Sequence, residues 1–184
     1  MSAIAILTGG ANKDALPPVV AKHVQGMNDF CKEHDGTPSQ SGEWVPFEGR
    51  SKFRRMPLVE HGVLEGSGRE IWAIDEGRFR CKPSDWLFSG SGGSQVYVFA
   101  KLDGGEVKEA FMQGAYGMSL THIGSSSRLS IQVGGPLCAQ AGDPSQGDSI
   151  RCNRPLQWDA STQKLDFSPL SEASFPTENG LQKD

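Results

Sequence analysis

The sequence predicts an α+β domain in which an N-terminal helix packs on an antiparallel meander sheet, with two disulfides. Three observations predict this class. The chain has 23 glycines and 11 prolines in 184 residues, well above the usual share of about 12%, which argues against a helical bundle and favours short strands joined by turns. Apolar residues recur at helical spacing in one early segment, whereas in later segments they occupy every second position, as in strands. Four widely spaced cysteines complete the pattern.

The first expected element is a helix that ends at Asp35-Gly36. Asn12 or Asp14 can cap its start, and Pro17-Pro18 falls in the first turn, where a missing N–H costs little. Gly26 is a weak point inside it. Its apolar residues recur at three- and four-residue spacing and form one stripe: Leu16, Val19, Val20, Val24, Met27, Phe30 and Cys31.

From residue 70 onward the hydrophobic period becomes twofold, which indicates strands. The clearest segment is 96–102, where valine, alanine and leucine alternate with other residues, and Asp103-Gly104-Gly105 after it is a hairpin turn. The expected strands cover residues 71–74, 96–102, 106–112, 116–120, 129–133, 156–158 and 165–167. A helix followed by such a meander predicts the α+β class.

The chain length suits one domain. We expect this domain to cover residues 12–168, between a flexible start at 1–11 and a loose tail at 169–184, which is rich in serine, glutamate and proline and lacks periodicity. Mean hydropathy is −0.41 and no run of 18 apolar residues occurs. We therefore expect no membrane span.

The four cysteines predict disulfides in an oxidising compartment, because they lack any C-x-x-C spacing typical of zinc or redox sites. Three pairings are possible. We favour Cys31–Cys81 with Cys138–Cys152, because the second pair flanks a short glycine-rich loop and Cys31 lies on the apolar stripe of the helix. The alternative is four buried thiols in a cytosolic protein.

The N-terminal residues give no signal peptide, since Ile4–Leu7 is too short for the apolar region and no basic residues precede it. The chain is therefore a mature form, a truncated one or a cytoplasmic protein. Export remains the better explanation of the cysteines.

Charge argues against nucleic-acid binding, because the net charge is −4 and the pI is about 5.6. One basic cluster, Arg50, Lys52, Arg54 and Arg55, could bind an anion. A solvated face is the simpler interpretation of such a cluster.

Catalytic patterns are weak in this sequence. No G-x-S-x-G motif occurs, so a small hydrolase would need Ser91 or Ser119 with His61 or His122 and Asp75. Such a site requires a serine Oγ within hydrogen-bond reach of a histidine nitrogen in a cleft. The glycine-rich segment 88–94 could hold a phosphate, but it leads into a strand rather than a helix, which favours a plain connection.

The segment 63–75, VLEGSGREIWAID, resembles the D-x-N-x-D-G-x-x-D calcium loops of FG-GAP-like repeats, which lead directly into a strand. Most acidic positions are replaced here. The resemblance leaves Glu65, Ser67 and Asp75 as calcium ligands, and we expect the loop geometry to persist while the metal is lost. No other cofactor is expected.

Longer segments carry a second resemblance. DEGRFRC at 75–81, WLFSGSGG at 86–93, the late cysteine pair and LQWD at 156–159 together resemble a group of small bacterial secreted proteins with a degenerate calcium-type loop. The match covers roughly residues 60–167 and an N-terminal helix with one cysteine. It implies export, disulfides and a non-enzymatic character. The missing signal peptide and acidic loop residues depart from the group's pattern.

Together these patterns predict a non-enzymatic bacterial periplasmic or secreted binding or accessory module, whose partner is a protein or a small ligand. We expect the 63–70 loop to lie beside the 88–94 loop and to form the contact surface. Its binding residues are Glu65, Ser67, Trp86, Phe88 and Ser91, with Trp86 and Phe88 as anchors. The alternatives are the hydrolase and a protein inhibitor or accessory subunit of a larger assembly.

Overall fold

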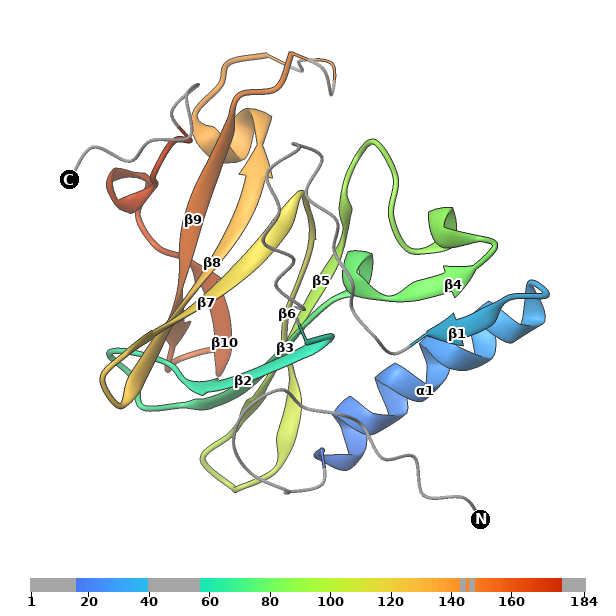
Figure 1. The fold of residues 1–184 in the computed structure, drawn as a ribbon. Coiled ribbons are helices and arrows are strands. Elements are labelled where there is room, and N and C mark those ends of the chain that lie inside the picture. Colours follow the sequence, from blue (N-terminus) through green and yellow to red (C-terminus); the bar gives the residue numbers. More distant parts are fainter. Residues whose placement is uncertain (1–15, 40–56, 143–144, 146–147, 177–184) are drawn as a thin grey trace.

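A computed structural model describes residues 16–39, 57–142, 145 and 148–176 (Figure 1). It contains one helix, α1 (Pro18–Glu33), and ten strands. The strands are β1 (Thr37–Ser39), β2 (Val59–Val63), β3 (Glu70–Asp75), β4 (Arg80–Lys82), β5 (Ser94–Lys101), β6 (Val107–Ala115), β7 (Gly117–Ile123), β8 (Ser126–Gly134), β9 (Arg151–Asp159) and β10 (Lys164–Phe167). Short 3-10 turns are η1 (Glu76–Arg78), η2 (Asp85–Leu87), η3 (Gly135–Cys138) and η4 (Leu170–Glu172).

The predicted α+β class with its N-terminal helix is confirmed, but the meander is divided between two sheets. One antiparallel sheet has the order β2-β3-β5-β6, the other has the order β10-β9-β8-β7, and β1 pairs with β4 in a small ribbon. The chain changes sheets between β6 and β7, and β7 pairs with β8. The sequence did not predict β1, β2 and β4.

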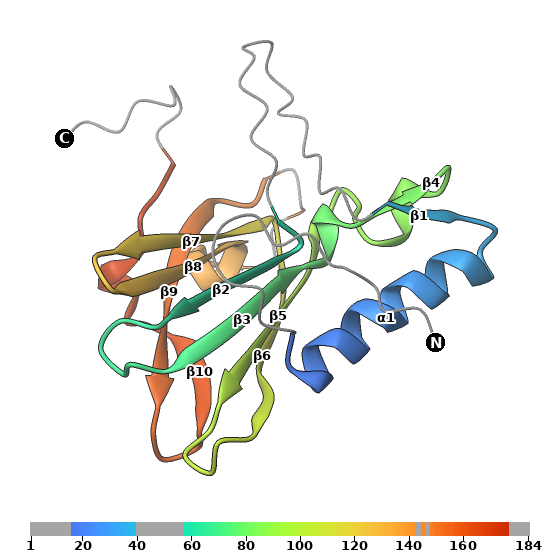
Figure 2. The ribbon, with the colours of Figure 1, turned by 60° about the horizontal axis from the view of Figure 1, so that its bottom comes forward.

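Apolar residues on both faces of the first sheet explain the division. On β3, Ile71 and Ala73 face a core between the two sheets, whereas Trp72 and Ile74 face a core beneath α1. A sheet that is apolar on both faces needs cover on each side. The second sheet covers one face and α1 covers the other, giving three layers (Figure 2).

The helix α1 follows the predicted stripe closely. Val20, Val24, Met27 and Cys31 are buried, whereas Phe30 is 42% exposed. Pro18 is the first helical residue, and the predicted caps Asn12 and Asp14 lie outside the described residues. The helix ends as expected, because Asp35 has a φ of 56° and the Gly36 N–H donates to the Cys31 carbonyl at 2.9 Å.

Both predicted disulfides are present. The bond Cys31–Cys81, here called the helix disulfide, joins α1 to β4, and Cys138–Cys152, the loop disulfide, joins η3 to β9. Gly36 packs directly against the helix disulfide, since a Cβ at this position would lie 2.2 Å from the Cys81 Sγ. The turn after α1 therefore needs glycine for close approach.

Some sequence-based predictions concern residues at the margins of the structure. The flexible start at 1–11 and the basic cluster at 50–55 lie outside the described residues. The predicted tail begins with η4, and Ser174 then exchanges two backbone hydrogen bonds with Asn153 of β9. Within the described ranges, α1 and the 3-10 turns fall short of the length and hydropathy that a membrane-spanning helix requires.

Candidate functional site

The two loops that the sequence analysis placed side by side lie at opposite ends of the first sheet. β3 and β5 are antiparallel, with Ile71 opposite Ala100 and Asp75 opposite Val96. The 63–70 loop precedes β3 and the 88–94 loop precedes β5, and antiparallel neighbours start at opposite edges. The expectation that the two loops lie side by side is therefore wrong. Glu65 and Ser67 belong to one end of the sheet, and Trp86, Phe88 and Ser91 belong to the other.

The three proposed calcium ligands do not converge either. Glu65 forms an ion pair with Arg128, and the Ser67 Oγ accepts a hydrogen bond from the Arg69 N–H at 3.3 Å. Asp75 lies at the far end of β3, where it accepts a 2.6 Å hydrogen bond from Ser94. Among the described residues, no group of three or more histidine, cysteine, aspartate or glutamate side chains is placed to hold a metal ion.

The residues named for a hydrolase are likewise dispersed. The His61 Nε2 lies 3.0 Å from Glu70 and its ring stacks on Trp72. The His122 Nδ1 lies 2.9 Å from a serine Oγ, but that serine is Ser127, a cross-strand neighbour that is 2% exposed. The Ser127 hydroxyl packs against the backbone of β2 at Gly62, where a Cβ would lie 2.5 Å from it. The pair therefore lacks the open cleft that a nucleophile needs.

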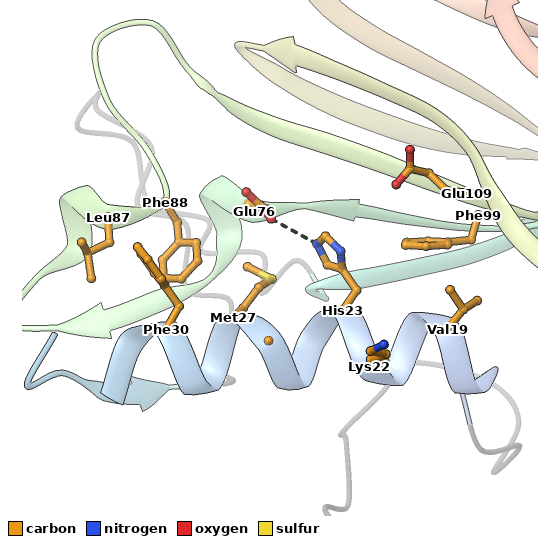
Figure 3. A pocket seen from close by; sticks show the side chains of 11 residues that line it. Val19, Lys22, His23, Met27, Phe30, Glu76, Leu87, Phe88, Phe99 and Glu109 are labelled. Carbon is orange, nitrogen blue, oxygen red and sulfur yellow. Dashed lines mark hydrogen bonds and ion pairs between the residues drawn. The ribbon is translucent and has the colours of Figure 1, made fainter. Parts of the chain in front are cut away.

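A groove of about 560 Å³ lies between α1 and the outer face of the first sheet (Figure 3). It is lined from three sides: by α1, by β5 and β6, and by the η1 and η2 turns. The lining residues are Val19, Lys22, His23, Gly26, Met27, Phe30, Glu76, Leu87, Phe88, Phe99 and Glu109. This size falls within the range of small-molecule sites, and apolar walls with few polar groups are typical of them.

Gly26 helps to keep the groove open. It lies in the middle of α1, three residues after His23, and a Cβ there would meet nothing within 4 Å. A helix interior glycine costs about 1 kcal/mol relative to alanine. The missing side chain at this position therefore leaves space on the groove side of the helix.

His23 is the central polar group of the groove. Its Nε2 lies 3.1 Å from the Glu76 Oε1, and both side chains are largely buried, at 19% and 17% exposure. Its ring packs on Tyr97 at 4.3 Å and on Phe99 at 5.7 Å between centroids. Burial, followed by the negative charges of Glu76 and Glu109, raises the pKa of the Tyr97 hydroxyl. Glu76 and Glu109 are the two acidic residues that line the groove.

Aromatic side chains close the other end of the groove. Phe88 makes edge contacts with Phe30 at 5.8 Å and with Phe79 at 4.8 Å between ring centroids. Trp86 lies in the adjacent η2 turn with 72% of its surface exposed. Of the five predicted binding residues, Phe88 lines the groove, while Trp86 and Ser91 are near it in the chain.

The principal groove residues were not predicted as a site from the sequence: His23, Gly26, Glu76, Phe99 and Glu109. The one available signal was Gly26, an unfavourable residue in a helix interior. The others come from four separate elements, which the tertiary fold brings together. No protein-family model matches the chain, and no curated protein and no solved structure shows a significant match to it.

Proposed function

We propose that the protein is a non-enzymatic bacterial periplasmic or secreted binding or accessory module, and that its ligand binds in the groove between α1 and the first sheet. The observation that carries the proposal is the open groove itself, which combines aromatic walls with a few polar groups. Surface pockets of this composition are the default candidates for ligand binding.

The helix disulfide supports this assignment. It fastens α1, which forms one wall, to β4, which follows the η1 turn that supplies Glu76. Both sulfurs are fully buried. The disulfide therefore fixes α1 to a segment five residues from Glu76 in the chain. A preformed site loses less entropy when a ligand binds. Two disulfides with no free cysteine in the chain also favour an oxidising compartment.

A matched pair of variants at Gly26 tests the groove. Gly26→Ala adds one methyl group where nothing lies within 4 Å, and it improves helix propensity. Gly26→Trp instead fills the groove from the helix side. We expect benzyl alcohol to shift the amide NMR signals of α1, β5 and η1 in the wild type and in Gly26→Ala, and to lose these shifts in Gly26→Trp. Shifts unchanged in Gly26→Trp, or absent from the groove in the wild type, would contradict the proposal.

The compartment has a separate test. Protein isolated from its native source should show both disulfides by intact mass before and after reduction and alkylation. Four alkylated cysteines without prior reduction would refute export and leave the groove assignment to stand on the NMR result.

A protein partner is the second candidate, because Trp86 is exposed beside the groove and large aromatic residues dominate interface hot spots. This possibility corresponds to an inhibitor or accessory subunit. A Trp86→Ala variant should retain benzyl alcohol binding yet fail to retain a partner that the wild type captures from periplasmic extract. Equal retention by both proteins would exclude Trp86 as an anchor.

A further inference from the structure

We propose that the groove recognises an organic cation, an ammonium group attached to an apolar body. This inference rests on the proposed function, since it names the class of ligand for the same groove. The charges and the aromatic rings that line the groove carry it.

The carboxylates of the groove define the preferred charge. Glu76 and Glu109 are its two acidic lining residues, and in Figure 3 they lie on the sheet side, on either side of the His23 ring. The Glu76 carboxylate already has His23 as a partner at 3.1 Å. Within the described part of the chain, the Glu109 carboxylate has neither a hydrogen bond nor an ion pair. One acceptor is thus available to a ligand.

The positive groups of the groove are placed differently. Lys22 is exposed on α1, and Figure 3 shows its side chain well apart from both carboxylates. His23 is the other group that can carry positive charge, and it is already paired with Glu76. Both carboxylates would repel a bound anion. The same carboxylates would attract a bound cation, and Lys22 would lie at a distance from it. Charge complementarity therefore favours the cation.

Aromatic rings supply the second requirement. Phe30, Phe88 and Phe99 line the groove. Phe99 makes an edge contact with the His23 ring, and in Figure 3 it lies on the same side of that ring as Glu109. The face of an aromatic ring attracts a cation through its quadrupole, and quaternary ammonium ions are commonly bound in this way. The aliphatic lining residues Val19, Met27 and Leu87 would contact the apolar body of the ligand.

Three probes that share a phenyl body test the inference: benzyltrimethylammonium, benzyl alcohol and phenylacetate. We expect the cation to bind most tightly and the anion most weakly in NMR titrations of the α1 amides. A partly exposed ion pair contributes little, so Glu109→Gln should weaken the cation by about 2- to 5-fold and leave benzyl alcohol unchanged. Glu172→Gln removes the same charge from η4, outside the groove, and serves as the matched control.

The outcomes separate this inference from the proposed function. If benzyl alcohol binds and Gly26→Trp abolishes its binding, the groove assignment holds. If the cation then binds no more tightly than benzyl alcohol, or Glu109→Gln acts no differently from Glu172→Gln, the cation inference is refuted and the groove remains. If no probe shifts the groove amides, both proposals are overturned.

Discussion

Replacement of Arg78 by alanine should severely destabilise the protein. The Arg78 side chain is 4% exposed and connects the two sheets from the η1 turn. It forms an ion pair with Glu60 of β2, and its Nη2 donates to the Met118 carbonyl of β7 at 2.8 Å. It also donates to the Pro57 carbonyl at 3.2 Å, and its Nε lies 3.6 Å from Asp75.

The magnitude follows from the groups that the substitution leaves behind. The side chains of Glu60 and Asp75 are 12% and 9% exposed, so both carboxylates would lose a buried counter-ion. Breaking a buried ion pair by removal of one partner costs about 3–5 kcal/mol. Net stabilities of domains are about 5–15 kcal/mol, so the variant should lose a large share of the total.

Urea unfolding followed by tryptophan fluorescence measures this loss. With an m value of about 2 kcal/mol/M, the midpoint should fall by about 1.5–2.5 M. Arg128→Ala is the control, because its ion pair with Glu65 is 52% exposed on the arginine side and contributes at most about 1 kcal/mol. If the alanine variant does not fold, Arg78→Lys keeps the charge and should still be less stable than Arg128→Ala. Equal midpoints for the two sites would refute the role of Arg78.

Three further predictions concern the disulfides, the turn after α1 and the groove. Replacing both cysteines of one disulfide by alanine should lower the free energy of unfolding by about 4 kcal/mol at the helix disulfide and by about 3 kcal/mol at the loop disulfide. The order follows from the sequence separations, which are 50 and 14 residues. Urea midpoints of the two variants test this order, and a larger loss at the loop disulfide would contradict it. Gly36→Ala should lower the free energy of unfolding by about 1–3 kcal/mol through overpacking, because the added methyl group would lie 2.2 Å from the Cys81 Sγ. Thermal unfolding should show a smaller loss when the same substitution is made in a protein without the helix disulfide. Since the folded-state pKa of Tyr97 is raised, its contribution to stability is full below its unfolded pKa of about 10 and is lost as pH rises above that value. In a Tyr116→Phe background, where Tyr97 is the one remaining tyrosine, Glu76→Gln should lower the ultraviolet titration midpoint; an unchanged midpoint would show that Glu76 does not act on Tyr97.

Local patterns predicted the elements and the covalent links, because their signals are contained in short stretches of sequence. The apolar stripe from Val20 to Cys31 specified α1, and Asp35-Gly36 specified its end. Twofold alternation identified most strands of both sheets. The spacing of the cysteines, together with the position of Cys31 on the stripe, was sufficient to choose the observed pairing.

The candidate site could not be predicted in the same way. His23, Glu76, Phe99 and Glu109 lie on four elements, and the alternation on a strand does not say which of two cores each face meets. The same limit explains why the two loops were wrongly expected to lie side by side. Each loop precedes a strand, and antiparallel neighbouring strands begin at opposite edges of the sheet.

The sequence by itself thus determined the class, the helix, most of the strands and the disulfide framework, all of which depend on local periodicity and spacing. The tertiary structure alone decided that the meander divides into two sheets, that α1 covers the outer face of the first, and that a groove remains at Gly26. The physical reason is that both faces of β3 and β5 are apolar, so each face required its own cover. Where the helical cover lacks a side chain, the groove is left open.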